Sequence, residues 1–354
     1  MMLKDKVKDD TFSIMKGLAI VSVVIGHCRP FPQLETFVNA YHLAVFFFIA
    51  GFFIKSKHLE STKYFIVGKF KRIMMPFFSA NLICLILFDW LVHYNIEYTE
   101  GVTGSFYDRL LALFSKCQFT AHIMGATWFL PALFVSLLLT FSVLKVSPKW
   151  SVRMLIIFLL IGFSKVAIYN NWLNVWGMWQ CCLIVPICLA GNYFTVVREV
   201  YDNYTGGGKT VIQIVIYLLI LLLLLSQKLS GGLQLGRLGY MNLMGVYGCA
   251  MFGSLMIYDV ARLMNSSRFL KLKKTLIICG DHSFAIMILH FIAFKTVTYL
   301  YCLIYGLPLR NVTAHPIIKY DSYIWFIPYL LSGIVLPILC DKGYEKLKTK
   351  IKVA

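Results

Sequence analysis

Hydrophobic and polar positions are arranged along the chain in long blocks. Runs of predominantly apolar residues, each close to the ~20 residues that a helix needs to cross a bilayer, recur from one end to the other. The pattern predicts ten membrane spans, at residues 12–29, 38–54, 76–94, 128–145, 153–169, 178–196, 211–227, 239–260, 276–304 and 324–341. We therefore expect an all-α fold, a polytopic transmembrane helical bundle, with residues 1–354 forming a single integral-membrane domain.

The distribution of Lys and Arg orients these spans, because basic residues are retained in cytoplasmic loops. If the N-terminus lies inside, 24 of the 34 basic residues fall in inner segments and 7 in outer segments. The others, Lys16, Lys165 and Lys295, lie in or at the edges of spans. The bias predicts that both termini are cytoplasmic. In the longest outer connection, residues 95–127, apolar residues recur at helical spacing around 106–114 and predict an interfacial helix.

Composition supports a membrane protein and argues against nucleic-acid binding, structural disulfides and a cysteine metal site. The chain is 59% hydrophobic and 14% charged, with a mean hydropathy of +0.74. Its formal net charge of +18 is a topology signal, and no nucleic-acid motif accompanies it. Most of the cysteines lie within or beside apolar runs, so we expect no structural disulfides. The adjacent Cys181 and Cys182 have no further ligand at metal-binding spacing, so we expect no metal site there.

Two polar residues lie on the first span. Lys16 and His27 are eleven positions apart, which is ~16 Å along a helix. An ionisable residue within a span is costly to insert, so it usually faces the protein interior or a wet cavity and is a functional candidate. His42 enters the second span after a short connection, which makes the first two spans antiparallel. We therefore expect His27 and His42 at similar depth.

Further candidates lie in the third and ninth spans. Lys69, Lys71 and Arg72 form a basic patch at the inner end of the third span, and such a patch suits a phosphorylated donor. The ninth span carries His290 and, further on, Lys295. Each has an ordinary alternative, such as an interfacial His, a snorkelling Lys or a lipid-binding patch. Together, intramembrane histidines able to act as general bases and a cytoplasmic basic patch indicate group transfer within the membrane.

These motifs, in this order, resemble those of the integral-membrane acyltransferase-3 family. They are Lys16-Gly17 with Gly26-His27, Tyr41-His42 before Phe46-Phe47-Phe48, Lys71-Arg72-x3-Pro76, Trp128-Phe129-Leu130-Pro131 and Ser283-x6-His290. The resemblance implies a bacterial polytopic enzyme that transfers acyl groups, commonly acetyl from acetyl-CoA, to hydroxyls of cell-surface sugars. Two positions depart from the family pattern: Lys16 replaces the usual Arg, and Ser13 stands where many relatives have Asp.

The resulting hypothesis is an acyl-CoA-dependent sugar O-acyltransferase of the bacterial cytoplasmic (inner) membrane. The resemblance implies that His27 is the general base, with His42 or His290 orienting the hydroxyl or stabilising the oxyanion. The phosphates of acetyl-CoA, the acyl-donor substrate, would bind Lys16, Lys69 and Arg72. The expected partners are acyl-CoA, a carbohydrate acceptor (a surface glycan or a lipid-linked sugar) and membrane lipids. We expect no nucleic-acid partner and no metal.

Two other classes of function would also account for a polytopic membrane protein with these residues. A proton-coupled transporter or flippase for a lipid-linked sugar would use the histidines as a proton relay, but it predicts inverted repeats and broken helices. The sequence shows no internal symmetry of that kind. A membrane scaffold for glycan synthesis would need none of the histidines and would tolerate their loss.

Overall fold

The computed structural model describes residues 9–99, 104–118, 120–226, 235–265, 270–320 and 322–353, apart from the side chains of 235–237 and 351–353. Within these ranges every regular element is a helix, which confirms the all-α prediction. Some of the basic residues used to orient the chain lie outside the described residues, namely Lys4, Lys6, Lys8, Lys228 and Arg268. The side chains of Arg237 and Lys352 lie outside them as well. The orientation of the chain stays a prediction.

Eight helical segments are long and apolar enough to cross a membrane. They are α2 (Pro32–Phe52), η2 with α8 (His122–Val146), α9 (Trp150–Tyr169), η3 with α10 (Val175–Tyr204), α11 (Lys209–Ser226), α12 (Leu243–Met264), α14 (Ser283–Ile304) and η7 with α15 (Tyr323–Lys350). The first predicted span is α1 (Thr11–His27), which at 17 residues is ~26 Å long and slightly shorter than a typical hydrocarbon core. The chain is an integral-membrane helical protein.

Two predicted spans are divided, and the prediction of one unbroken helix in each was wrong. Residues 76–94 form α5 (Met75–Ile86) and α6 (Phe88–His93), with Leu87 outside helical geometry between them. Residues 276–304 fall into α13 (Leu270–Asp281) and α14, separated at His282. At the second break the ring of His282 pairs with Asp341 of α15 at 2.7 Å, so polar contacts outside the helix stabilise the turn.

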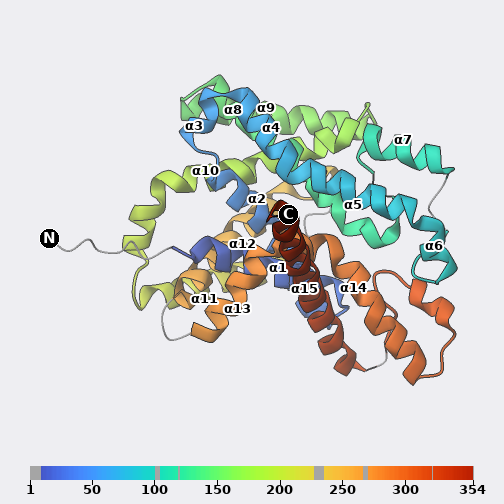
Figure 1. Ribbon diagram of the computed structural model, residues 1–354. Helices are drawn as coiled ribbons and strands as arrows, with labels where there is room; N and C mark the ends of the chain where they lie inside the picture. Colours follow the sequence, from blue (N-terminus) through green and yellow to red (C-terminus); the bar gives the residue numbers. More distant parts are fainter. Residues whose placement is uncertain are drawn as a thin grey trace.

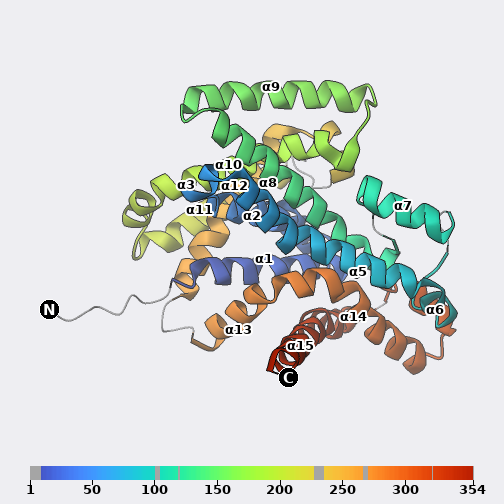
Figure 2. The same ribbon diagram turned by 45° about the horizontal axis from the view of Figure 1, so that its top comes forward.

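The central element of the bundle is α1. It packs against α2 and α12 on one side and against α13 and α14 on the other, as Figure 2 shows. The ring of Phe12, at the start of α1, contacts that of Phe52, at the end of α2, so the two helices are antiparallel as predicted. A side chain at Gly17 would overlap the backbone of Leu276 in α13, which explains why glycine follows Lys16. The central helix therefore carries both Lys16 and His27.

Three spans lie at the periphery. Only 17%, 11% and 17% of the residues in the spanning windows of α9, α11 and α15 are buried, against 56% in α2 and α12. Figures 1 and 2 both place α9 along one edge of the molecule. Its exposed side chains include Phe158, Leu159 and Phe163, which are compatible with lipid. The buried, polar positions are consequently concentrated on the inner helices.

The basic patch is carried by an irregular helical stretch, which extended Ser61 interrupts between its first two helices. It comprises α3 (Ser56–Glu60), α4 (Thr62–Lys69), a π-helical turn (Phe70–Met74) and then α5. Pro76 has no amide hydrogen to donate to the carbonyl four residues earlier, at Arg72. The π-turn lies where that hydrogen bond is missing, and such turns often occur at functional sites.

The predicted helix in the long outer connection is also present. It is α7 (Phe106–Lys116), and it begins with a capping box in which Ser105 and Asp108 satisfy each other's backbone amides. Hydrogen bonds from Ser105 lower the pKa of Asp108. The prediction of a helix here is confirmed, whereas its location in the membrane interface stays a prediction.

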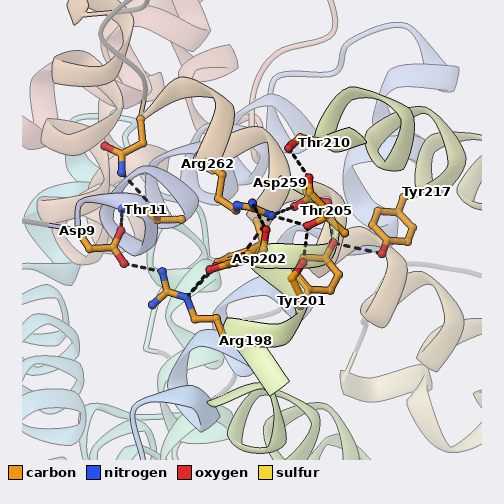
Figure 3. A network of polar contacts seen from close by, with 12 residues as sticks. Asp9, Thr11, Arg198, Tyr201, Asp202, Thr205, Thr210, Tyr217, Asp259 and Arg262 are labelled. Carbon is orange, nitrogen blue, oxygen red and sulfur yellow. Dashed lines mark hydrogen bonds and ion pairs between the residues drawn. The ribbon is translucent and has the colours of Figure 1, made fainter. Parts of the chain in front are cut away.

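The ends of α1, α10 and α12 are joined by a charge network, defined here as Asp9, Arg198, Asp202, Asp259 and Arg262 (Figure 3). Arg198 pairs with Asp9 at 2.5 Å, and Arg262 pairs with Asp259 at 3.1 Å and with Asp202 at 3.3 Å. Burial raises the pKa of Asp9, but hydrogen bonds from Thr11 and Arg198 outweigh it and lower that pKa. The network fastens the start of α1 to two other spans.

Candidate functional site

A cavity of about 280 Å³ lies where α1 ends beside α2. We call it the histidine cavity, since both His27 and His42 line it. The short connection between the two helices ends at Phe31, and the antiparallel return of the chain in α2 brings the two histidines to this common space. The other polar or aromatic residues of its lining are Glu35, Asn39, Trp128 and Phe129.

The ring of His27 is half-buried and stacks on a second histidine. Its centroid lies 5.3 Å from that of His290, with an interplanar angle of 26°, and 4.8 Å from that of Phe291. His290 comes from α14, is fully buried and lies behind His27 rather than in the cavity wall. The structure thus brings together the three histidines that the sequence singled out.

Backbone carbonyls determine which nitrogen carries the proton in two of these rings. His42 Nδ1 lies 2.6 Å from Val38 O, and His290 Nδ1 lies 2.8 Å from Ile286 O. A carbonyl only accepts hydrogen bonds, so Nδ1–H is the donor and Nε2 of each neutral ring is a hydrogen-bond acceptor. His290 Nε2 is buried and has no partner among the described residues.

A second imidazole cluster lies near this site and was not predicted from the sequence. Glu97, only 1% exposed, accepts a hydrogen bond from His122 Nδ1 at 2.8 Å and one from the amide of Ile123 at 3.0 Å. The carboxylate therefore orients the His122 ring. Glu97 and His122 are 25 residues apart with α7 between them, so no periodic pattern signals their pairing. The scarcity of acidic residues, 16 in the whole chain, was the only available signal.

His315 extends this second cluster toward the first. Its ring centroid lies 5.9 Å from that of His122 and 4.8 Å from that of Phe291, which also contacts His27. Lys295 holds the loop that carries His315, because its Nζ donates to the carbonyls of residues 312–314 at 2.8–3.1 Å. Burial, then the positive charge of Lys295, lower the pKa of His315 to about 4. The Lys295 side chain is therefore a structural anchor for the loop.

The basic patch forms a cavity of its own, with a volume of about 480 Å³. We call it the basic cavity; its cationic or imidazole-bearing lining residues are Lys55, Lys57, His58, Lys69, Lys71 and Arg72. Burial and the Arg72 guanidinium lower the pKa of Lys69. Partial burial, followed by the charge of Lys69, lowers the pKa of His58. The cations gathered in this lining give it a positive potential that favours anions.

The basic cavity lies at the opposite end of α1 from His27. Phe53 lines this cavity, and its ring contacts that of Phe12 at the start of α1, with centroids 5.3 Å apart. His27 is the last residue of the same helix. The basic cavity and the histidine cavity are therefore separated by approximately the length of α1.

Lys16 lines neither of the two cavities. It lies on α1 near the end of α13, where Asp281 attracts it electrostatically. Ser13 Oγ donates a hydrogen bond to Asp281 at 3.1 Å. A carboxylate from α13 thus lies beside the position where many relatives have Asp in α1. The structure brings Lys69 and Arg72 together but places Lys16 apart from them.

All ten cysteines carry free thiols, and nine of them are buried. Across the described ranges, no three His, Cys, Asp or Glu side chains are arranged to hold a metal ion.

A bundle of apolar helices with histidines gathered at one internal cavity and cations at another defines the chain as an integral-membrane protein with an intramembrane polar site. Comparison with known families makes the class specific. The profile of the acyltransferase-3 family, described as an acyltransferase domain, matches residues 10–342. The chain belongs to this family and is a membrane acyltransferase, as its motifs predicted. No curated protein and no solved structure matches it.

Proposed function

We propose that the protein is an O-acyltransferase that moves an acetyl group from acetyl-CoA to a hydroxyl of a surface polysaccharide or of its lipid-linked sugar precursor. Its proposed location is the bacterial cytoplasmic membrane. Membership of the acyltransferase-3 family supports the reaction class. The observation that carries the proposal is the placement of the basic cavity and the histidine cavity at opposite ends of one central helix.

The basic cavity is proposed to bind the phosphates of the donor. Arg72 offers a planar fork of N–H donors for a phosphate, and Lys69 contributes a point charge beside it. From there the thioester must reach His27, and the two cavities are separated by about the length of α1, ~26 Å. The pantetheine arm is proposed to run along α1 and α2 toward the histidine cavity. Lys16 is retained as a proposed contact along this path rather than as part of the phosphate site.

His27 is proposed to act as the general base. Its neutral imidazole takes the proton of the acceptor hydroxyl while the hydroxyl oxygen attacks the thioester carbonyl. The carbon–sulfur bond then breaks, the acetyl group stays on the sugar oxygen, and the proton passes from the imidazolium to the CoA sulfur. The products are an acetyl ester and CoA thiol, so atoms and charge balance.

His42 and His290 are proposed to orient the reacting groups. In the tautomer that their backbone carbonyls select, Nε2 of each neutral ring accepts a hydrogen bond. An oxyanion needs hydrogen-bond donors, so this tautomer favours an orienting role over oxyanion stabilisation. His42 lines the cavity and is suited to accept from a sugar hydroxyl, whereas His290 supports the ring of His27 by stacking.

The direct test is to replace His27 with alanine in the host and compare the O-acetyl proton signals of its surface glycan with those of the unaltered strain. We expect the signals assigned to this enzyme to disappear while the protein remains in the membrane at its normal level. Unchanged acetylation would contradict the catalytic assignment of His27. If the signals are lost in a strain lacking the whole gene but persist in the His27→Ala strain, the protein is the acetyltransferase but His27 is not its general base.

A further inference from the structure

Resting on the proposed function, we infer that one face of α2 is the acceptor subsite, and that Glu35 and Asn39 bind hydroxyls of a neutral sugar next to His27. Glu35, Asn39 and His42 all line the histidine cavity. They are four and three residues apart, the spacing that places side chains on one helix face. Three polar residues in this register form a polar stripe on the cavity side of α2.

The polar groups of this stripe are available to a ligand. The described residues contain no hydrogen-bond or ion-pair partner for the Glu35 carboxylate or for the Asn39 side-chain amide. Both side chains are only partly buried, on the cavity side of α2. Polar groups facing a cavity within a membrane protein are costly unless they meet water or a ligand. A sugar hydroxyl is such a ligand.

The backbone next to His27 is adapted to the Asn39 side chain. A β-carbon added at Gly26 would lie 2.8 Å from Asn39 Oδ1, which is closer than real side chains approach. Glycine at this position therefore lets the Asn39 side chain lie directly against the end of α1. Since His27 is the next residue, a hydroxyl bound by Asn39 is held close to the proposed base.

The chemistry of the lining identifies the class of ligand. A carboxylate and an amide bind neighbouring hydroxyls, and the indole of Trp128 offers an apolar ring face on which the C–H face of a sugar can rest. The negative charge of Glu35 repels a carboxylate on the sugar. The subsite thus favours a neutral hexose and disfavours a uronate.

The test uses purified full-length protein, acetyl-labelled acetyl-CoA and two acceptor probes, methyl glucoside and methyl glucuronoside. The variants are Glu35→Gln and Asn39→Ala. The matched control is Gln33→Ala, an exposed residue of the same first turn of α2 that lies outside the cavity wall. Thermal unfolding and binding of acetyl-CoA are measured for each variant, so a folding defect or a donor-site defect is recognised separately.

We expect Glu35→Gln to raise the KM for methyl glucoside about tenfold, because the hydroxyl loses a hydrogen bond to a charged group. The kcat and the binding of acetyl-CoA should stay unchanged. The same variant should reduce the preference for glucoside over glucuronoside. A wild-type KM in both Glu35→Gln and Asn39→Ala would overturn the subsite.

Transfer by the wild type to neither probe would overturn the subsite as a site for a neutral hexose. The proposed function is judged independently by the O-acetyl signals of the host glycan. If these persist when the gene is deleted, the proposed function fails, and the subsite fails with it.

Discussion

The charge network and the histidine cavity are both polar regions in an apolar protein, but their groups are paired to different degrees. In the network, fully buried Asp259 meets Arg262 at 3.1 Å and Tyr201 at 2.6 Å, and each of the two arginines has more than one partner. Behind His27, next to the histidine cavity, His290 Nε2 is buried without a partner in the described part of the chain. The carboxylate of Glu35, equally, has no partner there.

The degree of pairing distinguishes polar groups that stabilise the fold from polar groups that serve function. A buried polar group without a hydrogen bond costs free energy, so an unpaired group persists where a ligand or a reaction supplies the partner. A fully paired network instead stabilises the arrangement of helices. Substitutions in the network should therefore lower stability, and substitutions at the cavities should lower activity at constant stability.

The largest effect is expected for His27→Ala. Loss of a general base should reduce the rate of acetyl transfer by about 10²–10⁴-fold. The temperature of unfolding in detergent should stay close to that of the wild type, because the His27 side chain has no hydrogen bond within the described residues. The rate of acetyl transfer and the unfolding temperature are measured on the same preparation. If His27→Ala lowers the unfolding temperature as well as the rate, His27 is a structural residue like those of the charge network.

The network should respond in the opposite way. Asp259→Ala removes a buried partner of Arg262 and should lower the free energy of unfolding by about 3 kcal/mol. Thermal unfolding in detergent measures the change, and Glu345→Ala, at an exposed position on α15, is the control. An unaltered unfolding temperature for Asp259→Ala would show that the pairing does not stabilise the bundle.

A smaller, donor-specific effect is expected at the basic cavity. Arg72→Ala should raise the KM for acetyl-CoA about tenfold, because it removes a charge-assisted hydrogen bond, and Arg72→Lys should recover part of that loss. Lys63→Ala serves as control, since Lys63 lies on α4 outside the cavity wall. Steady-state kinetics distinguish the rise in KM for acetyl-CoA from a fall in kcat. An unchanged KM in Arg72→Ala would argue against phosphate binding at the basic cavity.

The smallest effect concerns pH. The pKa of His315 is about 4 in the folded protein, below its ordinary value of about 6.5, so the unfolded state binds the proton first as pH falls. The stability from neutral His315 is complete above about pH 6.5 and is lost between there and about pH 4. Because the ring is only half-buried, we expect a loss on the order of 1 kcal/mol. His315→Asn should reduce the pH dependence of the unfolding temperature; an identical profile would contradict this.

The features that a bilayer imposes on a chain could be predicted from the sequence. Long apolar runs were recognisable because a span needs many consecutive apolar residues, and a helix lies in each of the ten predicted runs. The meeting of His27 and His42 at one cavity follows from the short connection between antiparallel helices, although His42 lies about one turn further along α2 than the residues opposite the end of α1. The breaks at Leu87 and His282 were not predicted, since hydropathy alone does not show where a helix is interrupted.

Contacts between distant segments were beyond sequence reasoning. The pairing of Glu97 with His122 joins residues on either side of α7, and the Ser13–Asp281 bond joins residues 268 positions apart. Lys16 was expected to act with Arg72 because both are basic and near the inner face. The structure separates them, because α1 is central whereas the π-turn that carries Arg72 packs against α8.

The central claim is that His27 acts as the general base for transfer of an acetyl group from a donor whose phosphates are held at the basic cavity. It is tested most directly with purified protein in liposomes, given acetyl-labelled acetyl-CoA and chemically de-O-acetylated host polysaccharide or its lipid-linked precursor. We expect the wild type to place label on the glycan in equal amount to the CoA thiol released, and His27→Ala to bind acetyl-CoA with wild-type affinity yet transfer no label above background. Transfer by His27→Ala at the wild-type rate would contradict the account.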